Sequence, residues 1–441
     1  MMSDEIYDIL GVGIGPFNLG LAALLSPVAE VKAVFLEQKP EFLWHSGLLI
    51  EGATIQVSFL ADLVTMADPS SSFSFLNYLR AQSRLYHFYI LERFQIPRRE
   101  YNHYCQWVAS QLPSCRFGQR VEAVAWKGSQ SEGYFEVQSR DVESNQISTY
   151  KTRNLVLGVG SVPQVPQCFQ NLLPSDDIFH SAEFLHRRDR CRHAKSITVL
   201  GSGQSAAEVF YELLQEQETY GYRLEWHTRS QSFMPMEYSK LALEHFSPDY
   251  IQYFYHLSPE KRSQVFSQQS LLYKGISVET IVKIYDLLYE RSVAAKHPDV
   301  RLLPLVEAKE VAKVKTPAGS RYQIGYRHQQ QEERFNHETE CVVLATGYHH
   351  AIPKCIAGLK DLIQWDTQGR YGMGLDYRLA LNQEIPGSIF VQNGELHSHG
   401  VGAPDLGLGA YRNSVIINTL MKQTVYPVHS RNVFQQFGVA S

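Results

Sequence analysis

The chain has 441 residues, 44% of them hydrophobic, and a formal net charge of −4 at pH 7. A chain of this length can bury two hydrophobic cores, so we expect two or three domains. The charge balance gives no basic footprint for a nucleic-acid partner. No apolar run approaches the roughly 20 residues of a membrane helix, and the acidic amino terminus does not look like a signal peptide. The six cysteines lack Cys-x-x-Cys spacing, which favours reduced thiols and a cytoplasmic protein.

A glycine-rich turn follows the first predicted strand. Residues 6–10 form an apolar run typical of a strand, and residues 18–24 have the composition of a helix. Between them lie Gly11, Gly13, Gly15 and Pro16. Glycines allow close backbone approach, so free N–H groups and the positive end of the helix can face a phosphate. The next apolar run ends at Glu37, whose carboxylate suits the ribose diol of an unphosphorylated adenosine and predicts FAD.

The first lobe continues through residues 44–78, a segment rich in aromatic and hydroxyl side chains. A helix is expected around residues 101–111. Alternating patterns predict strands near residues 116–126, 134–139 and 155–157, and a breaker-rich loop closes the lobe.

A second glycine-rich turn lies about 190 residues after the first. Residues 196–200 predict a strand, and a helix is expected from residue 207. The turn between them contains Gly201, Ser202, Gly203, Gln204 and Ser205. The next apolar run is followed by Arg229 where the acid would be expected. Arginine pairs with a ribose 2′-phosphate that glutamate would repel, so this turn predicts NADPH.

A long insertion follows the second dinucleotide unit. Its clearest helix spans residues 278–289, with Ile281, Ile284, Tyr285 and Leu288 on one face. Such a face is typical of core packing, and a substrate lid is the alternative. Downstream, residues 341–348 form an apolar run that includes Thr346 and Gly347. This run is similar to the returning strand of flavoproteins that bind two dinucleotides, and we expect it to bring the chain back under the flavin.

Together these elements predict an α/β protein with two Rossmann-like dinucleotide-binding domains and a small helical substrate region. We place the FAD domain at residues 1–180 and 338–441. The NADPH domain takes residues 181–240 and 296–337, and the helical insertion takes residues 241–295.

Several motifs in order along the chain resemble the microbial N-hydroxylating flavin monooxygenases of siderophore biosynthesis. This family includes lysine N6-hydroxylases, ornithine N5-hydroxylases and diamine N-hydroxylases. The motifs lie at residues 11–19, 44–47, 56–60, 73–79, 201–206 and 345–348. The resemblance covers almost the whole chain and implies assembly as a dimer or tetramer.

The resemblance also implies a chemistry. NADPH reduces FAD, reduced flavin and O₂ form a C4a-hydroperoxide, and a neutral primary amine attacks its distal oxygen. Gln56 is the implied catalytic residue, placed beside the isoalloxazine where its amide helps to hold the hydroperoxide. Trp44 and His45 are implied to flank the flavin, and Gln204 and Ser205 to place donors against the NADPH phosphates. Trp44 and His45 could also be ordinary packing residues, and Arg229 a solvated surface cation.

The sequence departs from the amino-acid hydroxylases of the family at Ala61, where those enzymes typically carry a lysine that pairs with the substrate α-carboxylate. Leu243 and Gly275 stand where ornithine enzymes have asparagine. These departures predict a substrate without a carboxylate, a linear diamine such as putrescine or cadaverine. Glu244 and Asp62 are candidate acceptors for its far ammonium, and either could instead be structural.

Other readings remain open at this level. Lys240 or Lys274 could replace the missing cation, which would leave L-lysine or L-ornithine as substrate. The histidine pairs at residues 349–350 and 397–399 lack a metal-ligand spacing, so no metal is expected. A flavin disulfide reductase would need a redox cysteine pair near the turns, and none is present.

Overall fold

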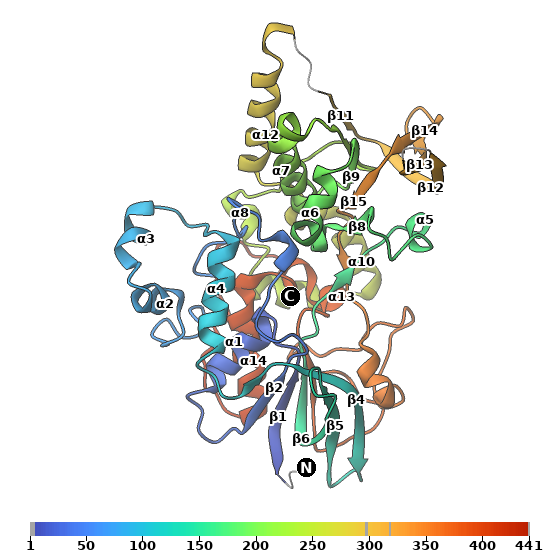
Figure 1. Cartoon of the computed structure of the whole chain (residues 1–441). Coiled ribbons are helices and arrows are strands. Elements are labelled where there is room, and N and C mark those ends of the chain that lie inside the picture. Colours follow the sequence, from blue (N-terminus) through green and yellow to red (C-terminus); the bar gives the residue numbers. More distant parts are fainter. Residues whose placement is uncertain (1–4, 296–298, 317–318, 440–441) are drawn as a thin grey trace.

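The computed structural model describes residues 5–295, 299–316 and 319–439. The chain forms two lobes, drawn one above the other in Figure 1, and each lobe is built around a largely parallel sheet. The α/β class and the pair of Rossmann-like units predicted from the sequence are confirmed. The sites predicted from the two glycine turns lie at the carboxyl ends of β1 (Ile6–Val12) and β9 (Ser196–Leu200).

The first lobe contains a seven-stranded sheet among the described residues. Its order is β3-β2-β1-β6-β5-β4, and β17 (Ile389–Val391) also pairs with β6 (Ile147–Leu157). The other strands are β2 (Ala33–Leu36), β3 (Cys115–Arg116), β4 (Gln119–Gly128) and β5 (Gly133–Asp141). The β3-β2-β1-β6 part and β17 are parallel, whereas β4 and β5 form an antiparallel hairpin.

Alternate side chains of β1 enter two different cores. Ile9 packs against α1 (Pro16–Leu25), α4 (Arg98–Ala109) and α14 (Gly409–Met421) on one face. Leu10 and Val12 pack on the other face against the β4–β5 hairpin and the segment around η4 (Lys354–Leu359). Burial on both faces explains why the strand reads as a continuous apolar run. Two further helices, α2 (Phe75–Ala81) and α3 (Leu85–Leu91), stand beside α4 (Figure 1).

The second lobe has a five-stranded parallel sheet in the order β11-β10-β9-β15-β8 among the described residues. Next to β9 lie β10 (Arg223–His227) and β15 (Cys341–Leu344), and the edge strands are β11 (Val300–Leu303) and β8 (Ile178–His180). Helices α6 (Phe184–Arg192) and α7 (Gln204–Tyr220) cover it. A separate antiparallel sheet is formed by β12 (Val306–Thr316), β13 (Gly319–His328) and β14 (Arg334–Thr339).

Strand pairing bears on the predicted domain limits. Limits at residues 180 and 338 would assign β8 and β15 to the first lobe, whereas both strands pair in the second sheet. β15 therefore belongs to the second sheet, and the expectation that residues 341–348 bring the chain back under the flavin stays a prediction. The chain returns only at β16 (Tyr348–His349), which pairs with β7 (Val162–Pro163). The limits at residues 1, 296 and 441 lie outside the described residues, and the domain division stays a prediction.

The helical insertion is divided between the lobes. It contains α8 (Lys240–Leu243), α9 (Pro248–His256), α10 (Pro259–Gln268), α11 (Ser270–Tyr273) and α12 (Val278–Arg291). Serine caps begin α9, α10 and α12, each accepting a hydrogen bond from a first-turn amide. Helices α9 and α10 pack against α13 (Leu396–His399) of the first lobe, whereas α12 packs against α7. Ile281 and Ile284 face this core, but Tyr285 is exposed.

A buried ion pair joins the two lobes. Arg98 at the start of α4 binds Glu208 of α7 in a bidentate pair, with both N–O distances at 2.8 Å. Arg98 also donates to the carbonyl oxygen of Leu48 at 2.7 Å. The side chains are 11% and 5% exposed. Removing one partner of such a pair leaves a buried charge without compensation.

We predict that Glu208→Ala lowers the free energy of unfolding by roughly 3–5 kcal/mol, because Arg98 is left buried and unpaired. Urea unfolding followed by tryptophan fluorescence measures this change. The double variant Arg98→Met/Glu208→Leu should recover much of the loss. Glu122→Gln, which removes a surface partner of Arg140, is the matched control and should leave the transition unchanged. A Glu208→Ala transition equal to that of the control would contradict the prediction.

Candidate functional site

The first glycine turn has the geometry that a pyrophosphate needs. Gly13 has φ +86°, and a Cβ there would lie 2.6 Å from the carbonyl oxygen of Gly158. A Cβ on Gly11 would lie 2.1 Å from the Phe35 ring. Both positions therefore exclude any side chain, and the close packing brings the ends of β1, β2 and β6 together.

The helices after both turns begin without a side-chain cap. Gly15 is the N-cap of α1, with Pro16 at the first helical position, and Gly203 is the N-cap of α7. Neither cap residue has a side chain, so first-turn N–H groups are left for another acceptor. A Cβ on Gly15 would meet no protein atom within 4 Å, and one on Gly203 would lie 3.6 Å from the Lys274 carbonyl oxygen. These open helix ends fit two phosphate groups.

Glu37 lies beside the first turn, as expected from its place after β2. Its carboxylate accepts hydrogen bonds from the backbone amides of Ile14 at 2.9 Å and Lys39 at 3.0 Å. These contacts fix its orientation. Each carboxylate oxygen keeps a further lone pair, so Glu37 can still accept from a ribose diol.

The second turn is held against the end of β10. Gly201 has φ +141°, and its amide donates to the carbonyl oxygen of His227 at 3.0 Å. The Ser202 and Ser230 hydroxyls lie 2.8 Å apart. Arg229, between β10 and Ser230, is exposed. Burial and the nearby Arg229 charge lower the pKa of Lys274. Two cations therefore stand together beside the second turn.

The nitrogen and the oxygen of the Gln204 amide both already have partners in the protein, so this amide is not free to bind a phosphate. Its nitrogen lies 3.0 Å from Glu208 and 3.1 Å from Thr280, and its oxygen accepts from the Ser277 amide at 2.8 Å. Gln204 therefore ties the second turn to the start of α12. Ser205, in the first turn of α7, is half-buried, and its contact with a dinucleotide stays a prediction.

Trp44 and His45 lie in an aromatic cluster that spans the lobes. Trp44 contacts Tyr101 with ring centroids 5.2 Å apart, and His45 contacts Tyr348 at 5.6 Å. Burial, with the charges of Arg98 and Lys39, lowers the pKa of His45 to about 4. The imidazole is therefore neutral at physiological pH, which suits a site that must accept an uncharged ring system.

Thr346 and Gly347 lie where the chain crosses back to the first lobe. The Thr346 hydroxyl donates to the carbonyl oxygen of Gln164, and the Gly347 carbonyl oxygen lies 3.0 Å from His180 Nε2. Gly347 has φ +84°, and no protein atom lies within 4 Å of the Cβ position. The crossing is thus anchored on both sides, and its exposed glycine leaves room for a ligand.

Gln56 carries the clearest sign of a missing partner. Its Nε2 is buried and makes no hydrogen bond among the described residues. A buried amide donor without an acceptor costs about 1–3 kcal/mol. The residue is therefore suited to donate to a bound group, as the resemblance to flavin monooxygenases implies.

Ala61 and Asp62 lie in a tightly bonded turn. Ala61 is 5% exposed. Asp62 accepts from the amides of Val64, Thr65 and Phe75 and from the Thr65 hydroxyl, at 2.7–3.0 Å. Burial raises the pKa of Asp62 against the effect of these hydrogen bonds. All these contacts serve the local fold, so the carboxylate of Asp62 acts as a structural staple beside Ala61.

Leu243 and Glu244 lie at the end of α8. Leu243 is 41% exposed. The Glu244 carboxylate accepts from the amides of Phe434 at 3.1 Å and Gln435 at 2.9 Å, which lowers its pKa. Glu244 therefore fastens the C-terminal segment to α8, and the structure does not bring it to Ala61 through any contact among the described residues.

Two groups near Ala61 were missed from the sequence. Asp405 caps η6 (Leu406–Leu408), and burial raises its pKa to about 6. The Tyr238 hydroxyl is buried without a hydrogen-bond partner among the described residues. The sequence around Asp405 and Tyr238 has no motif that marks either residue as part of a site. Their burial depends on how α14 and the insertion pack in the folded chain.

The described residues hold one group with three candidate metal-ligand atoms within 4.8 Å of one another, formed by Glu225, His227 and His337. It contains none of the histidines considered from the sequence. Glu225 lies 2.9 Å from His227 Nε2, and His337 Nε2 lies 3.0 Å from the Thr198 hydroxyl. These contacts describe a buried hydrogen-bonded cluster beneath the second turn.

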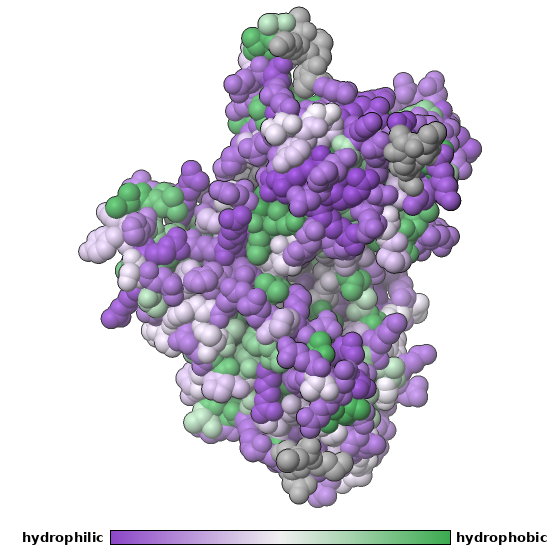
Figure 2. All heavy atoms as spheres, viewed as in Figure 1, coloured by the Kyte–Doolittle hydropathy of each residue, from purple (hydrophilic) through white to green (hydrophobic). Residues whose placement is uncertain are grey.

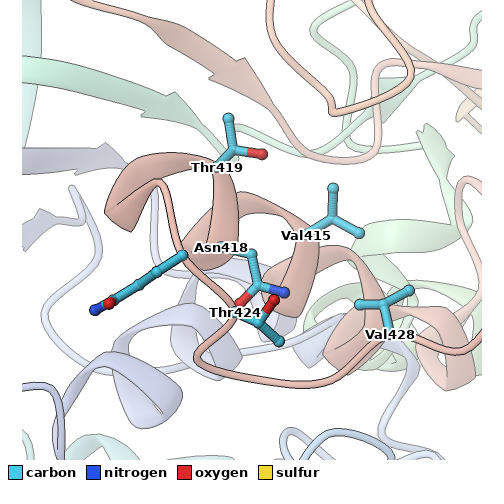
Figure 3. A pocket seen from close by; sticks show the side chains of 6 residues that line it. Val415, Asn418, Thr419, Thr424 and Val428 are labelled. Carbon is cyan, nitrogen blue, oxygen red and sulfur yellow. The ribbon is translucent and has the colours of Figure 1, made fainter.

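A surface hollow at the far end of α14 is unrelated to these residues. It is lined by Val415, Asn418, Thr419, Thr424 and Val428 (Figure 3). The Asn418 amide is already used, because it donates to the Tyr426 carbonyl oxygen and accepts from the Val425 and Tyr426 amides. The Asn418 amide is therefore not available to a ligand in this hollow.

We predict that Gly15→Val abolishes FAD retention and that Gly203→Val weakens NADPH binding at least tenfold while the protein stays yellow. Both positions have room for a side chain in the protein itself, so any loss reports the approach of a cofactor. Flavin absorbance after gel filtration and NADPH titration of flavin reduction measure the two effects. Equal loss of flavin in both variants would overturn the assignment of two separate turns.

Known proteins share this arrangement along almost the whole chain. Residues 5–350 match the profile of the L-lysine 6-monooxygenase/L-ornithine 5-monooxygenase family. Putrescine N-hydroxylase of Shewanella oneidensis is 44% identical over 98% of this chain and 84% of its own length. The rhizobactin siderophore biosynthesis protein RhbE of Rhizobium meliloti is 46% identical over 99% of this chain and 96% of its own length.

The solved structures give the same result. The FAD-bound cadaverine monooxygenase DfoA of Erwinia amylovora superposes with a TM-score of 0.94 at 42% identity, covering 99% of this chain and all of its own. An ornithine N-hydroxylase of Kutzneria with reduced FAD, NADP⁺ and L-ornithine gives 0.87 at 26% identity, over 95% of this chain and 99% of its own. The chain therefore belongs to the L-lysine 6-monooxygenase/L-ornithine 5-monooxygenase family of N-hydroxylating enzymes.

Proposed function

We propose that this enzyme uses FAD, NADPH and O₂ to hydroxylate one primary amine of a linear diamine, putrescine or cadaverine, for hydroxamate siderophore biosynthesis. The observation that carries the substrate class is Ala61. It is buried and held in place by the Asp62 staple, and it supplies no cation. An α-carboxylate buried there would lose its hydration without an adequate partner. The relatives named for putrescine and cadaverine support the same class.

The alternative substrates are L-lysine and L-ornithine. They would require another cation in place of the lysine that amino-acid hydroxylases typically carry at the Ala61 position. Lys274 stands beside Arg229 at the second turn, and Lys240 is an exposed residue of α8. Neither lysine forms a hydrogen bond or ion pair with the Ala61 turn among the described residues, which favours the diamine.

The residues present fit the two dinucleotides. We assign FAD to the turn of Gly11, Gly13, Gly15 and Pro16 with Glu37 on the ribose, and NADPH to the turn of residues 201–205. When bound, the flavin supplies the redox step that transfers oxygen to the amine nitrogen. Gln56 offers a buried donor that orients the reacting group, while Trp44 and His45 exclude water. A dry site also favours the neutral form of the amine.

Arg229 and Lys274 are proposed to read the 2′-phosphate of NADPH together. Two adjacent cations repel each other, and burial adds to the effect that lowers the Lys274 pKa. A dianionic phosphate bound beside both cations would offset their repulsion and would favour the charged form of Lys274. The pair therefore supports a preference for NADPH over NADH.

We further propose a homo-oligomer, a dimer or tetramer, in the cytoplasm. Helix α3 has no buried residue, and Tyr86, Tyr89 and Ile90 are 82%, 75% and 73% exposed. This apolar patch is visible over α3 at the left of Figure 2. Contiguous exposed apolar surface of this kind marks protein contacts. The cytoplasmic location rests on six free cysteines and the need for NADPH. No helix of the described residues is long and apolar enough to cross a bilayer.

The substrate assignment predicts that putrescine and cadaverine exceed lysine and ornithine in kcat/KM by at least tenfold. Ala61→Lys should weaken diamine turnover, because the new ammonium repels the far ammonium of the substrate, and should raise amino-acid turnover. NADPH-dependent O₂ uptake with hydroxylamine detection measures both. If the wild type hydroxylates lysine or ornithine as efficiently as the diamines, the diamine assignment is wrong and the amino-acid alternative takes its place.

The oligomer assignment predicts that Tyr89→Asp/Ile90→Asp lowers the molar mass measured by light scattering, because two charges disrupt an apolar contact. Tyr289→Asp on α12 is the matched control, since Tyr289 is 69% exposed on a different surface. Its mass should equal that of the wild type. A monomeric wild-type protein would rule the proposal out.

A further inference from the structure

Asp405 lies between the two segments that the proposed substrate must touch. A Cβ placed on Gly407 would lie 2.9 Å from Asp405 Oδ1 and 3.7 Å from Ala61 Cβ, so the carboxylate and Ala61 flank the same point. Two residues further on, a Cβ on Gly409 would lie 3.0 Å from the Phe17 ring, in the helix that follows the first turn. The segment holding Asp405 therefore connects the Ala61 turn to the start of α1.

The Asp405 carboxylate has no counter-ion of its own. Oδ1 accepts from the Gly407 amide at 2.8 Å, which fixes the side chain as the cap of η6. No side-chain donor of the described residues hydrogen-bonds to it. Arg412, whose charge also acts on Asp405, forms no hydrogen bond or ion pair with it among the described residues; its Nη2 pairs with buried Glu395 at 2.9 Å and donates to the Ala403 carbonyl oxygen at 2.6 Å. The carboxylate thus remains available to a ligand.

The Asp405 side chain is enclosed by protein yet keeps some accessible surface. Tyr238 lies near enough for the Asp405 charge to act on it, because burial together with that charge raises the pKa of Tyr238 to about 12. The buried Tyr238 hydroxyl has no hydrogen-bond partner among the described residues. An unpaired acid near an unpaired hydroxyl suits a cationic ligand.

We propose that Asp405 accepts the far ammonium of the diamine, with the Tyr238 hydroxyl beside it. The inference rests on the proposed function and deepens it, because it names the residue that selects a second amine. Ala61 removes the cation that a carboxylate would need, and Asp405 adds an anion for an ammonium in the same space. The Asp405 carboxylate then both attracts the far ammonium of a diamine and repels the α-carboxylate of an amino acid.

Asp405 replaces both acids considered from the sequence. Asp62 spends its two oxygens on three amides and a hydroxyl of its own turn, and Glu244 binds two amides of the C-terminal segment. Each already has its hydrogen bonds to the fold. Asp405 accepts from the Gly407 amide, the Leu408 amide also acts on it, and no side-chain donor of the described residues hydrogen-bonds to it.

The protonation of Asp405 supports the same role. Burial raises its pKa to about 6, with the Gly407 amide and Arg412 acting in the opposite direction. The other titratable groups that face it are Tyr238 and Tyr101, both neutral at this pH because burial raises their pKa. The carboxylate is therefore charged above about pH 6 and is lost as an acceptor as the pH falls through that value.

The test compares putrescine with n-butylamine, which lacks the far ammonium, in the wild type, Asp405→Asn and Glu244→Gln. Asparagine keeps the oxygen that caps η6, so the fold is preserved. Asp405→Asn should raise the putrescine KM roughly ten- to a hundredfold, with a smaller change in kcat and no change in the substrate-free NADPH oxidation rate. Glu244→Gln should leave the preference for putrescine over n-butylamine unchanged. In the wild type the putrescine KM should rise below about pH 6, and this limb should vanish in Asp405→Asn.

The outcomes separate the two levels of the argument. A wild type that hydroxylates neither amine refutes the proposed function. A wild type that hydroxylates putrescine, with an Asp405→Asn variant of equal KM, refutes only the role of Asp405. A loss of putrescine preference in Glu244→Gln with none in Asp405→Asn assigns the far ammonium to Glu244 instead.

Discussion

The Arg98–Glu208 pair is the interaction on which the arrangement of both turns depends. It joins the first residue of α4 to α7, one helical turn after Gly203 and Gln204. Arg98 also holds the Leu48 carbonyl oxygen, and its charge contributes to keeping His45 neutral. The Arg98 guanidinium therefore links the two lobes close to the second dinucleotide turn. The same charge helps to keep the His45 imidazole neutral.

The proposed substrate space is built from segments that are far apart in the sequence. The Ala61 turn is closed by Asp62, the loop before α8 contributes Tyr238, and the stretch before α14 contributes Asp405. Each segment is anchored by backbone hydrogen bonds rather than by its neighbours in the site. This independence lets a change of charge at residue 61 or 405 alter substrate preference without disturbing the dinucleotide turns, which are held by sheet geometry.

The dinucleotide turns could be predicted because their signals are local. A strand, two glycines at fixed spacing and a helix lie within about 20 residues, and Glu37 and Arg229 follow at the ends of the next strands. The sheet that receives β15 could not be predicted, because an apolar strand carries no mark of its partner. Asp405, the acid near Ala61, was also missed, because no pattern in the sequence marks which distant segments pack together. The sequence motifs pointed to Asp62 and Glu244, and only the folded chain shows that backbone amides already donate hydrogen bonds to both carboxylates.

The two lobes also differ in when all their strands have been synthesised. The second sheet is assembled from a continuous stretch, β8 to β15, whereas the first sheet needs β17 and the helix pair of α1 with α14. Synthesis proceeds from the amino terminus, so the second sheet has all its described strands while the first lobe still lacks β17 and one helix of its core, α14. The turn at Gly13 is made first, yet its surroundings are completed last. A chain cut before residue 389 would therefore retain every described strand of the second sheet while lacking β17 and α14 of the first lobe.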